Sequence, residues 1–154
     1  AGLTVGQDIS DRAVQFHATP PQFNLGKSFD TFGPIGPILV SPDEFEDPNS
    51  LELECSVNGE LRQKDNTNDL IFDIPYIISY VSEFITLEPG DLIFTGTPAG
   101  VGATQGKCLK DGDILSTTIK GIGTIENQCL RIADHSNVSH IPEFLKGKMP
   151  ANDD

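Results

Sequence analysis

Three polar side chains near the amino end are spaced so that they could act together. Asp8, Arg12 and Gln15 stand four and three residues apart, and residues at these spacings share one face of a helix. Spacing alone favours an ordinary solvated face with an Asp–Arg ion pair, since such pairs are common and contribute little. The other interpretation makes Asp8 a metal ligand, because carboxylate oxygens suit Mg²⁺ and Mn²⁺. One carboxylate is not a complete site, so both interpretations stay open.

Two further segments offer groups that suit an anionic ligand. Lys27 lies in a stretch rich in Gly, Pro and Phe, and it is either a surface lysine or a cation held against apolar neighbours. The stretch TGTPAGVG over 95–102, which contains Thr97, is either a tight structural loop or a nest of N–H groups and hydroxyls that receives a carboxylate. It lacks the lysine of a P-loop and the glycine spacing of a dinucleotide site, so nucleotide binding is not expected.

The histidines and cysteines give weaker signals. His17 is expected to be a surface or hydrogen-bonded histidine, and His135 with His140 forms a pair that lacks further ligands. The three cysteines show no metal-ligand spacing, which favours free thiols in a reducing compartment. We therefore expect a cytoplasmic protein, or one of the mitochondrial matrix if the source is eukaryotic.

Composition limits the partners. The chain has 154 residues and a formal charge of -13, which argues against nucleic acid and against an anionic membrane surface. No apolar run approaches membrane-spanning length. An anionic small molecule remains compatible with this charge if cations or a bound metal reverse its sign locally.

The apolar pattern predicts a mainly β (α+β) domain over 1–133 and a polar tail over 134–154. The clearest signal is a hairpin in which Asn58-Gly59 joins two strands. A helix is predicted over 74–87, with Asp73 as its cap and Pro75 in its first turn. Strand–helix alternation is absent, which excludes a doubly wound α/β fold. Further strands are expected at 2–6, at 37–41, at the start of 92–102, and twice within 112–132, where the chain bends at Gly121 and Gly123. Residues 19–37 are expected to form an irregular segment rich in Gly and Pro. The tail is expected to dock through Ile141, Phe144 and Leu145.

Six segments together resemble one family. They are GQDISDR, LGKSFDTFGPIGP, VNGELRQKDNTNDLIF, PGDLIFTGTPAGVG, LKDGD and GIGTIEN, and they are similar in order and spacing to the catalytic domain of the fumarylacetoacetate hydrolase superfamily. The likeness is to its acylpyruvate hydrolase, oxaloacetate decarboxylase and 2-hydroxyhepta-2,4-diene-1,7-dioate isomerase branch. The fold implied is the β-roll or barrel of the family's C-terminal domain, with one main helix and long Gly/Pro loops.

The resemblance implies a role for each candidate residue. Asp8 would bind Mg²⁺ or Mn²⁺, and Lys27 would be the active-site lysine. The residues that would contact the substrate are Arg12, Gln15, Lys27 and Thr97, and Arg12 and Lys27 would also be catalytic. The implied substrate is a small 2-oxo acid or dicarboxylate, such as an acylpyruvate or oxaloacetate, and the implied reaction is C–C cleavage, decarboxylation or isomerisation through a metal-stabilised enolate. The resemblance also implies a homodimer.

The chain departs from the family pattern in one respect. The resemblance implies two more metal ligands, in a Glu-x-Glu pair upstream of the segment where this sequence starts. Glu52 and Glu54 have that spacing but occupy the outer face of a hairpin strand, so the role is not transferred to them. We therefore expect that the chain lacks an upstream segment and that this piece is inactive alone. The alternatives are a non-catalytic family member that acts as an assembly or binding module, and a β-rich interaction domain without a small-molecule site.

Overall fold

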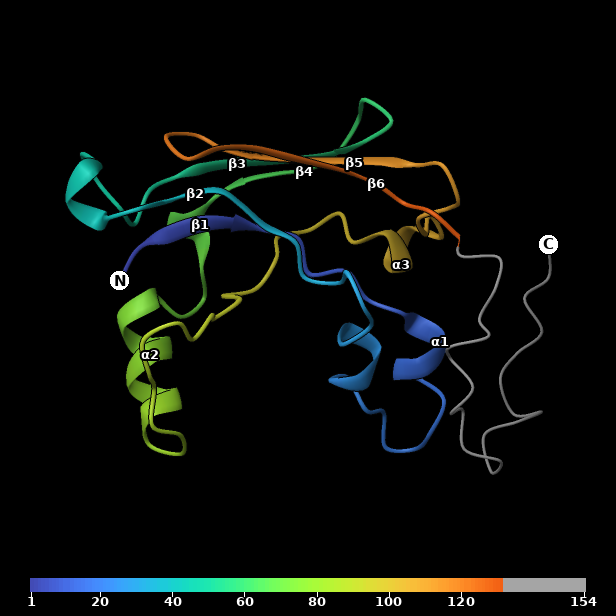
Figure 1. Cartoon of the computed structure of the whole chain (residues 1–154), viewed down its shortest axis with the longest axis horizontal. Coiled ribbons are helices and arrows are strands. Elements are labelled where there is room, and N and C mark those ends of the chain that lie inside the picture. The colour runs from blue at the N-terminus through green and yellow to red at the C-terminus, as the bar shows by residue number, and fades with distance from the viewer. Residues whose placement is uncertain (132–154) are drawn as a thin grey trace. The chain divides into compact units, whose positions relative to one another are not determined.

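The computed structural model describes residues 1–131, which fall into two compact units (Figure 1). The first unit contains residues 1–6 and 35–129, and the second contains residues 7–34 with 130–131. The predicted tail over 134–154, with His135 and His140, lies outside the described residues. Among residues 1–131, no helix is long and apolar enough to cross a membrane.

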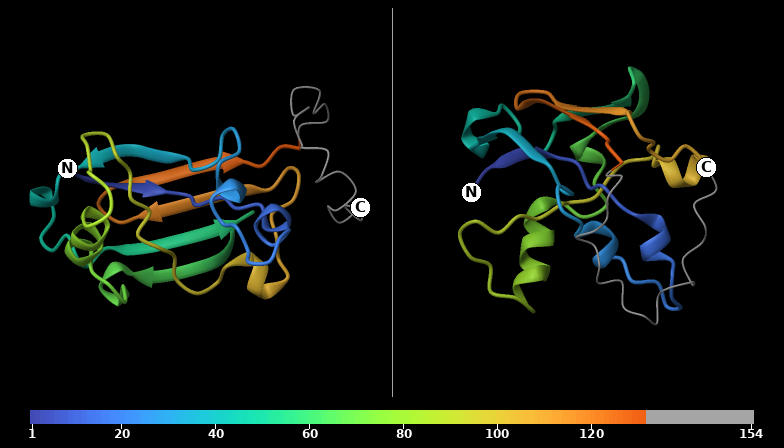
Figure 2. Two further views of the ribbon diagram at one scale, coloured as in Figure 1. Left: turned by 90° about the horizontal axis from the view of Figure 1, so that it is seen from below. Right: turned by 45° about the vertical axis from the view of Figure 1, so that its right-hand side comes forward.

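The first unit is built on antiparallel strands (Figure 2). A two-stranded sheet pairs β1 (Leu3–Gly6) with β2 (Ile35–Val40). A four-stranded sheet has the order β4-β3-β5-β6, and its strands are β3 (Glu52–Val57), β4 (Glu60–Asn66), β5 (Ile114–Ile119) and β6 (Gly123–Gln128). The expectation of a mainly β fold with one main helix and long Gly/Pro loops is confirmed.

The predicted hairpin is confirmed. Asn58 has φ 51° and Gly59 has φ 77°, and a two-residue turn of type I′ requires positive φ at both positions. Asn is one of the few residues with a side chain that tolerates this conformation, and Gly tolerates it at no steric cost. The turn therefore sets the register of β3 and β4, with Val57 opposite Glu60. One β-bulge follows, between Cys55 and Ser56.

The core of this unit lies between the two sheets. Val5, Leu51 and Ile122 are its buried members, and Leu3, Val40, Phe45, Ile119 and Ile125 pack against them. The predicted bend at Gly121 and Gly123 is also confirmed, because it is the turn between β5 and β6. A side chain at Gly121 would press on the ring of Phe45, with a closest approach of 2.9 Å, so the tight turn and the packing both require glycine there.

The main helix is shorter than predicted. Helix α2 covers Ile74–Ser82, and the Asp73 carboxylate accepts a hydrogen bond from the backbone N–H of Tyr76 at 2.8 Å, as expected of an N-cap. The short elements of this unit are η2 (Pro42–Glu44), η3 (Thr67–Asp69) and α3 (Gly102–Gln105).

The strand predicted at the start of 92–102 is wrong. Residues 91–101 form no strand, and the side chains of Leu92 and Phe94 stay exposed. An apolar run indicates a preference for burial, but a strand also needs a neighbour for its backbone hydrogen bonds, and residues 1–131 provide none here. The segment is instead placed by contacts such as that of the Phe94 ring with Gly6 of β1.

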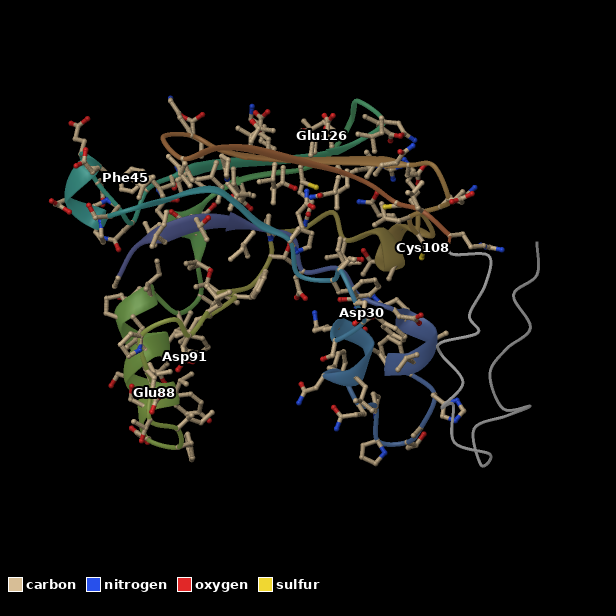
Figure 3. The ribbon with its side chains drawn as sticks, viewed as in Figure 1. Asp30, Phe45, Glu88, Asp91, Cys108 and Glu126 are labelled. Carbon is tan, nitrogen blue, oxygen red and sulfur yellow. The ribbon has the colours of Figure 1, made fainter. Side chains whose placement is uncertain are left out.

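The described residues of the second unit form only short helices. Helix α1 covers Arg12–Gln15 and η1 covers Leu25–Lys27. The idea that Asp8, Arg12 and Gln15 share one helix face is wrong, because Asp11 is the N-cap and Asp8 precedes it. The three cysteines are free thiols, as predicted, and Cys108 is exposed (Figure 3).

Candidate functional site

Asp8 and Lys27 form the charged part of the candidate site. The ammonium group of Lys27 lies at the end of η1 and donates to Asp8 Oδ2 in a short ion pair, and it also donates to Ser10 Oγ at 3.0 Å. The side chain of Lys27 is 33% exposed and that of Asp8 is 44% exposed, so both remain open to a ligand. The ion pair expected between Asp8 and Arg12 is therefore replaced by one between Asp8 and Lys27, which are 19 positions apart in the sequence.

Arg12 and Gln15 form the second part. Gln15 is fully buried, and its Oε1 accepts a hydrogen bond from Arg12 Nη1 at 2.7 Å. Its Nε2 donates to the carbonyl oxygen of Phe23 at 3.3 Å. A buried amide must satisfy both its donor and its acceptor, and here it does so by joining helix α1 to the loop that precedes η1. Gln15 thus holds the Arg12 guanidinium in place and has no exposed surface of its own.

Glycine at position 26 allows this arrangement. A Cβ on Gly26 would lie 2.5 Å from Gln15 Cγ and 2.7 Å from the backbone oxygen of Asp11. The Gly26 carbonyl accepts a hydrogen bond from the backbone N–H of Asp11 at 2.7 Å, and Asp11 in turn caps α1 through the N–H of Val14. The backbone next to Lys27 therefore lies directly on α1, and this close contact determines where the lysine side chain begins.

Thr97 belongs to the first unit, whereas Asp8, Arg12, Gln15 and Lys27 belong to the second. Gln63 of β4 donates from Nε2 to Thr97 Oγ1 and to the carbonyl of Pro98, both at 2.9 Å. The Thr97 hydroxyl keeps its own proton to donate, which is the property that a carboxylate ligand would use. Sequence reasoning missed Gln63, and no spacing pattern relates it to Thr97, 34 residues away.

The outward-facing glutamates of β3, Glu52 and Glu54, form ion pairs with lysines on the surface. Glu52 accepts a hydrogen bond from Lys120 at 2.9 Å, and this contact lowers the pKa of the Glu52 carboxyl. Glu54 pairs with Lys64 at 2.5 Å, and this contact raises the pKa of Lys64. Within residues 1–131, no three or more His, Cys, Asp or Glu side chains gather in a group that could hold a metal. Asp8 is thus the metal-ligand candidate that this part of the chain offers.

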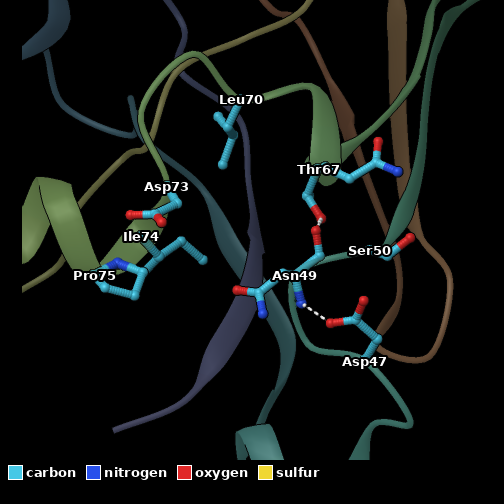
Figure 4. A pocket seen from close by; sticks show the side chains of 9 residues that line it. Asp47, Asn49, Ser50, Thr67, Leu70, Asp73, Ile74 and Pro75 are labelled. Atoms are coloured by element: carbon cyan, nitrogen blue, oxygen red, sulfur yellow. Dashed lines mark hydrogen bonds between the residues drawn. The ribbon is translucent and has the colours of Figure 1, made fainter.

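One hollow lies elsewhere in the first unit and does not include the candidate residues (Figure 4). Its volume is about 430 Å³, and it lies beside the N-terminus of α2. Its polar groups largely bond one another: Asn49 N–H donates to Asp47 at 2.9 Å, and Thr67 Oγ1 donates to the Asn49 carbonyl at 2.9 Å. The lining residues are Asp47, Asn49, Ser50, Thr67, Asn68, Leu70, Asp73, Ile74 and Pro75.

Comparisons with known proteins agree on one family. The family model described as "Fumarylacetoacetate (FAA) hydrolase C-terminal" matches residues 1–130. A mitochondrial oxaloacetate tautomerase of Bos taurus, FAHD2B, is 47% identical over 130 residues, which are 83% of this chain and 41% of that protein.

Solved structures give the same result. The 2-hydroxyhepta-2,4-diene-1,7-dioate isomerase of Mycobacterium marinum is 43% identical with a TM-score of 0.75, over 86% of this chain and 49% of that one. A fumarylpyruvate hydrolase of Pseudomonas aeruginosa, solved with Mn²⁺ and pyruvate, is 32% identical with a TM-score of 0.76, over 85% of this chain and 55% of that one. The chain therefore spans about half the length of these relatives.

Proposed function

Because this chain belongs to the fumarylacetoacetate hydrolase family, whose members include hydrolases, isomerases and tautomerases, we propose that it carries part of the active site of such an enzyme. The proposed substrate is a small 2-oxo acid or dicarboxylate, such as an acylpyruvate or oxaloacetate. The proposed reaction is C–C bond hydrolysis, decarboxylation or isomerisation through an enolate. The observation that carries the proposal is the ion pair of Asp8 with Lys27, in the same unit as the Arg12–Gln15 pair.

The proposed cofactor is Mg²⁺ or Mn²⁺, with Asp8 as one ligand. Asp8 fits this role in chemistry, because its side chain is partly exposed and carboxylate oxygens are the ligands that these ions prefer. One carboxylate supplies too few oxygens for a complete site, so we propose that the substrate and a Glu-x-Glu pair beyond these 154 residues supply the others. When bound, the ion would act as a Lewis acid toward the substrate's oxo group.

Lys27 and Arg12 supply the positive charge that the protein itself contributes. A 2-oxo dicarboxylate carries two negative charges, and enolate formation places negative charge on the oxo oxygen, which is neutral in the ground state. A lysine fixed by Asp8 and Ser10, and a guanidinium fixed by Gln15, need little reorganisation when that charge develops. Thr97 would donate its hydroxyl proton to a substrate carboxylate.

Oxalate tests this proposal, because it resembles the enolate of a 2-oxo acid in its two adjacent oxygens. Because Asp8 is the one metal ligand proposed on this chain, we expect weak binding: Mn²⁺ with oxalate, at concentrations well above those that a complete site would need, should raise the melting temperature of the 154-residue chain and release a measurable heat of binding. Asp8→Ala should abolish both responses, since it removes the ligand on this chain. Lys27→Ala should weaken oxalate binding and leave the circular dichroism spectrum unchanged.

The Glu54–Lys64 ion pair is a matched control. It is an exposed carboxylate–lysine pair like Asp8–Lys27, and it lies on the outer face of the sheet. Glu54→Ala and Lys64→Ala should leave the Mn²⁺–oxalate response unchanged. An equal loss in these variants would mean that the ions respond to total charge and would refute the site. Unfolding by Lys27→Ala would assign that lysine a structural role.

The remaining parts of the proposal concern assembly and location. We propose a homodimer in a reducing compartment, either the cytoplasm or the mitochondrial matrix. Three free thiols support the reducing compartment. An intact fold with no response to metal and oxalate would favour the alternative, a non-catalytic family member that acts as an assembly or binding module.

A further inference from the structure

An aromatic ladder runs along helix α2. Tyr76 and Tyr80 stand four residues apart on one side of α2, and Phe72 before the helix and Phe84 after it continue the row through ring contacts. Phe72 stacks on Tyr76 with ring centroids 4.8 Å apart, Tyr76 on Tyr80 at 6.5 Å, and Tyr80 meets Phe84 edge to face at 5.3 Å. The ladder is therefore an ordered surface and not four independent side chains.

This ladder is exposed in the described part of the chain. The four rings are between 52% and 71% exposed, and the neighbouring Ile71 is 91% exposed. No residue of α2 is buried, although most of its residues are apolar. A helix in water normally buries one apolar face, and a contiguous exposed patch of aromatic side chains on a protein marks an interaction surface.

The charges around the ladder limit what can cover it. Residues 65–106 contain six acidic residues and no Lys or Arg, and Figure 3 shows two of them, Glu88 and Asp91, beside α2. Two copies of this chain would bring two such acidic rims together, which is unfavourable in an interface. An anionic membrane surface is disfavoured for the same reason. The occupant must be apolar at its centre and basic or uncharged at its edge.

We propose that the ladder on α2 is the docking surface for the portion of the family's length that this chain does not span. This chain covers 41% of the bovine tautomerase and 49% of the mycobacterial isomerase, so a comparable length of polypeptide accompanies the matching region in those proteins. A helix with no buried residue needs such a covering segment to remove its rings from water. This inference is independent of the Asp8 site and of the proposed reaction.

A chimera tests the proposal. In it, residues 1–130 of this chain replace the matching 130 residues of the bovine relative, and hydroxyl-radical oxidation is followed by mass spectrometry. Tyr76 and Tyr80 are the only tyrosines in the 154-residue chain, which makes them specific reporters of the ladder. We expect their oxidation rates to fall several-fold in the chimera relative to the 154-residue chain. Unchanged rates in a chimera with a cooperative unfolding transition would overturn the proposal.

A matched control separates the ladder from general burial. Leu61 on the edge strand β4 is 53% exposed, close to the 55% of Tyr80, and its oxidation rate should not change. Phe72→Gln with Phe84→Gln should lower the melting temperature of the chimera and have little effect on the 154-residue chain, whereas Leu61→Gln should affect both equally little. Protection of the tyrosines that instead rises with the concentration of the 154-residue chain would assign the surface to a second copy and refute the proposal.

Discussion

The four-stranded sheet and the segment that carries the candidate site are held together in different ways. The sheet is joined by backbone hydrogen bonds along three strand pairs and packs on an apolar core around Leu51. The segment over 7–34 has one helical turn at α1, and the largest side chain that it buries is polar, that of Gln15. Stability in the sheet is spread over many residues, whereas in the site segment it rests on a few contacts that also orient charged groups.

The largest effect is expected in the core of the sheet. Leu51→Ala removes buried methyl groups that face Val5 and Ile122, and we expect it to lower the free energy of unfolding by about 2–5 kcal/mol. Chemical denaturation measures this loss. Leu61→Ala in β4 is the control, because that side chain is exposed and its truncation should change stability by no more than about 0.5 kcal/mol. Equal effects would mean that the core does not lie between the two sheets.

The next effect is expected in the site segment and should be local. Gly26→Ala introduces a Cβ that overlaps Gln15 Cγ and the backbone oxygen of Asp11, and we expect a destabilisation of about 1–3 kcal/mol. Hydrogen exchange should accelerate in α1 and leave the strands β3 and β5 protected. Leu25→Ala is the matched control, since Leu25 is adjacent and 66% exposed.

A uniform rise in hydrogen exchange across the sheet would contradict this difference between the sheet and the site segment. It would mean that the two regions unfold as one cooperative structure. A Gly26→Ala variant that keeps native exchange in α1 would show that the loop next to Lys27 can shift away from Gln15 at no cost. The Mn²⁺–oxalate response of the same variant then reports whether the position of Lys27 depends on this contact.

The sequence predicted elements whose signals are local. Asn58-Gly59 specified the turn between β3 and β4, and Asp73 with Pro75 specified the start of α2, because a turn or a cap depends on residues that are neighbours in the chain. The glycines at 121 and 123 marked the turn between β5 and β6 in the same way.

The failures concern contacts between residues far apart in sequence. The apolar run that begins at Leu92 has strand composition, but strand formation depends on a partner that composition does not reveal. The spacing of Asp8 and Arg12 suggested a pair, yet Asp8 bonds Lys27 across a loop. Periodicity likewise gave no sign that Gln15 would be buried, because a polar residue predicts exposure unless its partners are known.

An effect of similar size tests whether Gln15 holds the Arg12 guanidinium or only fills a buried position. Gln15→Leu leaves Arg12 Nη1 and the Phe23 carbonyl without their partner, and we expect a loss of about 1–3 kcal/mol. Gln15→Glu restores the acceptor for Arg12 but not the donor for Phe23. In ¹⁵N spectra, the Arg12 guanidinium should rotate faster in the leucine variant and remain restrained in the glutamate variant. Equal rotation in both variants would mean that Gln15 does not hold Arg12.

The smallest effect is a pH dependence at residues outside the candidate site, beginning with Asp113 immediately before β5. The Lys110 N–H and the Asn58 amide donate to the Asp113 carboxylate and hold its pKa below the usual value. A folded-state pKa below the unfolded one stabilises the fold above the unfolded pKa and loses that contribution as pH falls through the folded pKa. Asp113→Asn should therefore flatten the loss of melting temperature on acidification below about pH 4.

The pKa shift of Asp69 has the opposite sign. Its neighbour Asp65 raises the pKa of the Asp69 carboxyl, so the contribution of Asp69 to stability grows as pH falls through the folded pKa. Asp69→Asn should accordingly steepen the acid loss, and the same sign in both variants would refute the assignment of these shifts to their neighbours.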